Sequence, residues 1–137
     1  MKVFRTITCL AMMTVGSGAA HAQSVPQTID FEAILTSCSA DSDGCVARLQ
    51  AALTQINALK ATTSTAVIDN LLGSLATVAA SAAQQSPSIS RDLGGVVNSI
   101  AESSSAERQE SLREVAGNIS SGRSGEIDLS AIAGSPA

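Results

Sequence analysis

Two cysteines, Cys38 and Cys45, are the residues of this chain best suited to covalent chemistry. A redox-active pair is one interpretation, but such pairs usually have Cys-x-x-Cys spacing and a basic neighbour that lowers a thiol pKa. Neither feature is present, because six residues separate the cysteines and none of them is basic. We therefore expect a structural disulfide between Cys38 and Cys45, formed in an oxidising compartment.

The residues between the cysteines include Asp-Ser-Asp-Gly at positions 41–44, which raises the question of calcium binding. An EF-hand loop aligned on Gly44 needs acidic ligands at positions 39 and 50. The chain has Ser39 and Gln50 there, so the first ligand and the bidentate last ligand are both missing. The simpler interpretation is that Asp43 caps a helix and Gly44 eases the turn before it. We expect no metal site.

Enzyme chemistry is difficult to assemble from the remaining side chains. The single histidine, His21, lies near the start of the chain, and Lys60 is the only lysine after residue 2. A catalytic Ser–Lys pair would need a serine placed beside Lys60, and with a single lysine the sequence contains no Ser–Lys spacing that singles out one serine. Glu110 and Glu114 share a helix face with two arginines, which is typical of a solvated surface. We expect a protein that is not an enzyme and that needs no cofactor.

Residues 1–22 have the three parts of a cleavable signal peptide. Two basic residues are followed by an apolar stretch over residues 7–15 and by Ala-His-Ala, a small-x-small site ending at Ala22. Cleavage there leaves Gln23 as the first residue. A membrane anchor is the alternative, but the apolar stretch is far shorter than the ~20 residues that span a bilayer. We expect a periplasmic or secreted protein of a bacterial envelope.

The composition after residue 22 excludes several kinds of binding site. Six basic residues stand against twelve acids, a formal charge of −6, and Phe31 is the only aromatic residue. Nucleic-acid binding needs basic surface, and single-strand readers also need stacking side chains. Leu, Ile, Val and Phe supply 27 of 115 residues, while Ala and Ser supply 39. We therefore expect no nucleic-acid partner and a lean core supported by a disulfide or by association.

Apolar residues after residue 22 recur mostly at spacings of three and four, which is typical of amphipathic helices. Alternation with period two is absent over strand-length segments, and residues 127–131 come nearest to it. The fold class we predict is all-α, a small antiparallel bundle of four to five short helices. The expected helices cover Thr28–Cys38, Asp43–Lys60, Ser64–Ala83, a segment from Ser90 and a segment from Ser104, the last with a capping box to Glu107.

The expected domains are a signal peptide at 1–22, a helical domain at 23–121 and a flexible tail at 122–137. The tail is rich in Gly and Ser, although Ile127, Leu129 and Ile132 are apolar enough for part of it to dock. The third expected helix is apolar enough to raise the question of a membrane span. Its Asp69 and Asn70 favour a buried bundle helix instead, so we expect no span.

One face of that third helix carries only small residues, at spacings of four and three. Mid-helix glycine costs roughly 1 kcal/mol relative to alanine, so a compensating close contact is expected at Gly73. Another helix of the same chain is the favoured neighbour. A second copy or a partner protein is the alternative, which makes this face a candidate interface: Ala66, Asn70, Gly73, Thr77 and Ala80.

No catalytic, metal, nucleotide or nucleic-acid motif remains in the sequence, and its residues point to no known family. We expect an exported helical protein that acts through protein–protein contact in the cell envelope, with an unidentified protein partner or by self-association. The alternative is a helical bundle that carries an apolar small molecule or lipid between its helices.

Overall fold

A computed structural model describes residues 29–132 of the 137-residue chain. Two segments, 1–28 and 133–137, lie outside the described residues. The expected signal peptide at 1–22 and the expected cleavage between Ala22 and Gln23 fall in the first of them.

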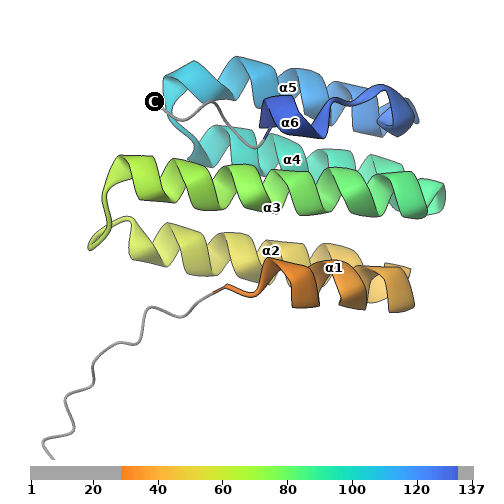
Figure 1. Cartoon of the computed structure of the whole chain (residues 1–137), viewed down its shortest axis with the longest axis horizontal. Helices are drawn as coiled ribbons and strands as arrows, with labels where there is room; N and C mark the ends of the chain where they lie inside the picture. The colour runs from red at the N-terminus through yellow and green to blue at the C-terminus, as the bar shows by residue number, and fades with distance from the viewer. Residues whose placement is uncertain (1–28, 133–137) are drawn as a thin grey trace, which may run out of the picture.

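Residues 29–132 form helices and turns without any strand, which confirms the predicted all-α class. The helices pack together as a bundle, and short connections join them (Figure 1). Two single 3₁₀ turns, η1 and η2, interrupt the order of the six α-helices, of which the last falls in the segment expected to be a tail. In chain order the elements are α1 (Phe31–Ala40), α2 (Ser42–Leu59), α3 (Thr65–Gln85), η1 (Pro87–Ile89), α4 (Ser90–Ser103), α5 (Ala106–Ser120), η2 (Ser124–Glu126) and α6 (Leu129–Ile132).

The central element of the bundle is α3, which contacts each of the other five α-helices. The α1–α2 hairpin lies on one side of α3, and α5 with α6 lies on the other (Figure 1). By length and hydropathy α3 is the one described helix that could cross a membrane, and 56% of its apolar window is buried inside the protein. Its apolar side chains thus form the middle of the core, as the buried-helix interpretation predicted.

Small and aliphatic side chains fill the core. Five alanines of α3 are buried together with Leu72 and Leu75, so neighbouring helices can approach closely. The largest fully buried side chains come from the first five helices, and α1 contributes only Cys38, its one buried residue. They are Leu49, Ile56, Leu72, Leu75, Leu93, Val97, Ile100, Ile119, Cys38 and Cys45.

The turn between α1 and α2 consists of one residue, Asp41, which ends α1 and caps α2. The Asp41 carboxylate accepts a hydrogen bond from the backbone N–H of Gly44, at 3.1 Å between Oδ1 and N. The prediction that Asp43 caps this helix is therefore wrong by two residues. Asp43 lies instead in the first turn, where a carboxylate interacts favourably with the helix dipole.

The pairing of α4 with α5 explains a glycine that costs helix stability. A Cβ at Gly94 would lie 2.9 Å from the Ala116 carbonyl oxygen and closer still to the Ser120 hydroxyl. A side chain at this position would therefore push the two helices apart. Gly95, by contrast, has open space where its Cβ would be.

The start of α5 differs from the predicted capping box. Ser105, not Ser104, is the N-cap residue, and its side chain makes no capping hydrogen bond. Ser104 is buried, and its hydroxyl donates to the Ile100 carbonyl oxygen at 2.8 Å. The cap comes from α3, where the Asp69 carboxylate accepts from the Ser105 backbone N–H at 3.0 Å.

Part of the segment expected to be a flexible tail docks on the bundle, within residues 122–132, as its apolar residues allowed. Ile127 and Ile132 are buried, and α6 and η2 both contact α3. The side-chain amide of Gln84 donates to the Ser124 carbonyl oxygen at 2.9 Å, which fixes the start of this segment. Ordering a Gly- and Ser-rich segment costs conformational entropy. The free energy gained by burying the two isoleucines offsets that cost.

Candidate functional site

The predicted disulfide is present. Cys38 and Cys45 are joined at an S–S distance of 2.07 Å, and their exposed fractions are 1% and 0%. The bridge links the last turn of α1 to the first turn of α2 and is covered by the core. Its burial supports the structural interpretation, because a redox-active cysteine is usually accessible to its reaction partner.

In the acidic segment between the cysteines, the Asp41 carboxylate contacts neighbouring residues with both of its oxygens. One oxygen of Asp41 accepts from Gly44, and the other lies 3.3 Å from the Arg48 guanidinium, in the one ion pair found over residues 29–132. In the described part of the chain there is no group of three or more His, Cys, Asp or Glu side chains that could hold a metal. The run serves as a helix cap.

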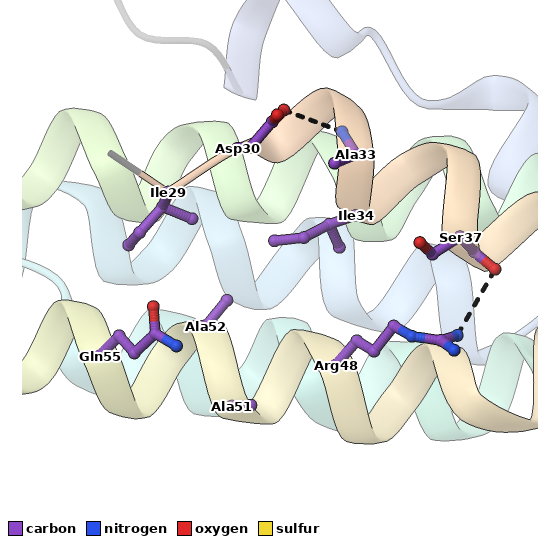
Figure 2. A pocket seen from close by; sticks show the side chains of 9 residues that line it. All are labelled: Ile29, Asp30, Ala33, Ile34, Ser37, Arg48, Ala51, Ala52 and Gln55. Carbon is purple, nitrogen blue, oxygen red and sulfur yellow. Dashed lines mark hydrogen bonds between the residues drawn. The ribbon is translucent and has the colours of Figure 1, made fainter. Parts of the chain in front are cut away.

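An open groove of about 370 Å³ with a mainly apolar lining lies between α1 and α2. Figure 2 shows α1 along one wall and α2 along the other, with Ile34 pointing into the space between them. Ile29 and Ile34 are half-buried, so part of their apolar surface remains open to solvent. The lining residues are Ile29, Asp30, Ala33, Ile34, Ser37, Arg48, Ala51, Ala52 and Gln55.

Two charged residues line this groove, Asp30 from the start of α1 and Arg48 from α2 (Figure 2). Asp30 begins α1, where its carboxylate caps the helix by accepting from the Ala33 backbone N–H at 2.9 Å. Arg48 lies at the end that holds the disulfide, and its guanidinium reaches the Ser37 carbonyl oxygen at 3.5 Å. Both charged groups therefore have partners within the hairpin, since Arg48 also pairs with Asp41.

The alternative of a Ser–Lys pair can be examined in a second hollow, of about 240 Å³, where Lys60 meets three serines. The Lys60 amine donates to the backbone carbonyl oxygen of Ser103 at 2.6 Å and not to a hydroxyl. The Ser103 hydroxyl instead accepts from Asn57 at 3.3 Å. Lys60 thus satisfies a carbonyl at the C-terminal end of α4, where a cation is favourable. This arrangement explains the lysine without catalysis.

A third hollow, of about 500 Å³, lies where α4 begins and α5 ends, and half of its lining residues are serines, beside Arg91 and Asp92. Ser90 lines it and is 4% exposed, but its hydroxyl has no hydrogen-bond partner and is itself shielded from solvent. The hydroxyl therefore does not offer a ligand a contact. The two carboxylates singled out in the sequence, Glu110 and Glu114, are exposed on α5.

The small-residue face of α3 is divided between core and surface. Gly73 and Ala80 are buried, Thr77 is half-buried, and Ala66 and Asn70 are exposed. These five positions therefore do not form one continuous surface.

The close neighbours of Gly73 belong to the same chain. A Cβ there would lie 2.5 Å from the Arg108 guanidinium and 3.1 Å from the Ile132 carbonyl oxygen. Arg108 also donates to the Asp69 carbonyl oxygen at 2.9 Å. Internal packing, the favoured interpretation, thus explains the glycine.

Two functional features could not be read from the sequence. The groove arises only when α1 and α2 are placed side by side. The hydrogen bond of the Asp69 carboxylate comes from the backbone N–H of Ser105, 36 residues further along the chain. The sequence did contain one indication of the groove. The apolar stripe of α1 includes Ile34 and Leu35, which are only half-buried, in addition to the buried Cys38.

The fold and the groove define a small, disulfide-bridged helical protein. The chain matches no protein-family model, no curated protein and no solved structure.

Proposed function

We propose that this chain is an exported helical protein that acts through protein–protein contact, without enzymatic chemistry of its own. The observation that carries the proposal is the groove between α1 and α2. Its middle is apolar and open to solvent, and its lining has neither a cysteine thiol nor a histidine. Such a surface favours binding of an apolar side chain or a helix face over catalysis.

Export to a bacterial envelope is part of the proposal, as a periplasmic or secreted protein. It rests on the pattern of residues 1–22 and on the bridge between Cys38 and Cys45, since disulfides persist in oxidising compartments. Intact-mass analysis of the exported protein tests it. The proposal predicts a chain that begins at Gln23 and carries two protons fewer than the free-thiol form.

The alternative, a carrier of an apolar molecule or lipid, draws support from the same apolar lining. It is weaker because the space between the described helices is filled by side chains such as Ala76, Ala79 and Ala83, each 0% exposed. A carried lipid would need a cavity that encloses most of its surface. The open groove covers only one side of a bound molecule.

The proposal is tested by recovery of the tagged mature protein from the envelope of its host. The parent is compared with Ala51→Arg, which places a long charged side chain in the groove, and with Gln50→Arg, an exposed position on the same helix outside it. A bound protein lost only from Ala51→Arg supports protein contact. Native mass spectrometry that finds a lipid, and no protein, on the parent supports the carrier.

A further inference from the structure

Residues 124–132, which contain η2 and α6, lie along α3 and run in the opposite direction (Figure 1). At the start of this segment the Gln84 amide donates to the Ser124 carbonyl oxygen at 2.9 Å. At its end the Ile132 carbonyl oxygen lies 3.1 Å from the position of a Cβ at Gly73, about three turns earlier in α3. The segment therefore covers the C-terminal half of one face of α3.

The covered face of α3 consists mostly of small residues. Positions three or four residues apart share a helix face, so four residues lie in line under the segment: Gly73, Thr77, Ala80 and Gln84. Gly73 and Ala80 are buried, and the Thr77 hydroxyl donates to the Gly73 carbonyl oxygen at 3.0 Å. Between its two ends, this face therefore has its polar groups satisfied without the segment.

The segment also forms hydrogen bonds within itself. The Asp128 carboxylate accepts from the backbone N–H of Ser130 at 2.9 Å and from its hydroxyl. The Ala131 N–H donates to the Asp128 carbonyl oxygen at 3.1 Å. The buried apolar side chains of the segment are Ile127 and Ile132. Beyond its first residue, its attachment to α3 thus depends on two isoleucines.

The end of α5 does not depend on the segment that follows. The N–H groups of Gly122 and Arg123 donate to the Ile119 and Asn118 carbonyl oxygens at 3.0 and 2.9 Å, which satisfies the last turn of the helix. Gly122 is exposed and has a φ of 76°, a conformation that glycine adopts without strain. The chain can therefore turn at Gly122 while α5 keeps its hydrogen bonds.

We propose that residues 124–132 are a strap that opens and closes on α3 as one unit, with Gly122 as its hinge, while α1–α5 stay folded. Local opening is favoured where few apolar groups are buried and few hydrogen bonds cross to the rest of the protein. Opening exposes two isoleucines, and the Gly- and Ser-rich segment regains conformational entropy. The open state uncovers the small residues between Gly73 and Gln84, and the closed state shields them from solvent.

The strap is independent of the groove between α1 and α2, because the two lie on different sides of α3 (Figure 1). The strap therefore goes beyond the proposed function, and each can fail without the other.

Native-state hydrogen exchange of the exported protein, resolved by mass spectrometry, tests the strap. In the parent, the amides of residues 126–131 should exchange about tenfold or more faster than those in the middle of α3. Two matched substitutions then separate opening of the strap from unfolding of the bundle. Ile56→Val, in α2, should accelerate exchange in α3 by about fivefold and leave the strap unchanged. Ile132→Val should accelerate exchange in the strap by about fivefold.

Two results of this experiment overturn the strap. If residues 124–132 came away from α3 only when the bundle unfolds, Ile56→Val would accelerate exchange in the strap and in α3 alike. Strap amides that exchange as slowly as those of α3 in the parent would also exclude separate opening.

Thiol labelling tests whether the strap is what covers α3. Ala80→Cys places a thiol on the covered face, and Ala66→Cys places one at an exposed position of the same helix. Adding Ile132→Val should accelerate labelling of the Ala80→Cys variant by about fivefold and leave labelling of the Ala66→Cys variant unchanged. Labelling of the Ala80→Cys variant that does not respond to Ile132→Val overturns the proposal.

Discussion

Removing the disulfide is the perturbation whose effect can be worked out most directly from the structure. The variant Cys38→Ala with Cys45→Ala opens a ring of eight residues. The loop-entropy relation gives about 2.5 kcal/mol of lost stability for a ring of this size. For a domain of about 100 residues that loss corresponds to a fall in Tm of about 10–20 °C.

The loss of stability on removing the disulfide should be concentrated in α1. Cys38 is its only buried residue, and an isolated helix of 10 residues is not stable in water. Without the bridge, α1 is held by half-buried side chains alone, whereas α3 keeps its buried leucines and alanines. Hydrogen exchange should therefore accelerate over residues 31–40 and remain slow over α3.

Thermal unfolding followed by circular dichroism, together with hydrogen exchange, measures both effects. The parent in dithiothreitol should approach the behaviour of the double variant, and the double variant should not respond to the reductant. An unchanged Tm, or equal acceleration of exchange over α1 and α3, would refute the argument that the bridge anchors α1.

Three further results are expected. Gly94→Ala should lower the free energy of unfolding by about 1–3 kcal/mol, because the added methyl group meets the Ala116 carbonyl and Ser120. Gly95→Ala has open space for its methyl group and should raise the free energy of unfolding by about 0.5–1 kcal/mol. Urea unfolding of both variants measures this difference in sign. Asp41→Ala should cost about 1 kcal/mol through loss of the α2 cap, and Asp43→Ala should cost less in the same assay. The hydroxyl and backbone N–H of Ser130 lower the pKa of Asp128 below 3.8, so this contribution to stability is complete above pH 3.8 and is lost as the pH falls through the lower value. The Ser130 amide should therefore exchange faster only under acidic conditions, and a change near neutral pH would contradict the assignment.

Local spacing predicted most of the helices because each amphipathic stripe is visible within a few turns of sequence. The bridge was predictable because Cys38 and Cys45 are the only cysteines left once residues 1–22 are set aside. The choice between Asp41 and Asp43 as the cap was not predictable. Two aspartates two positions apart both fit a cap, and only the backbone conformation decides between them.

Long-range contacts account for the remaining differences. The docking of residues 122–132 depends on a space beside α3 that receives Ile127 and Ile132, and the sequence near them is typical of a mobile segment. The cap of α5 by Asp69 joins residues far apart in the chain. The groove depends on the relative placement of two helices, which no local pattern specifies.

Site-specific photo-crosslinking in the host cell tests the central claim most directly. A photoreactive amino acid at position 51 lies in the groove, and the same amino acid at position 50 lies on the same helix outside it. Protein contact through the groove predicts a crosslinked protein species from position 51 and not from position 50. Equal crosslinking from both positions, or crosslinking to lipid alone, would contradict it.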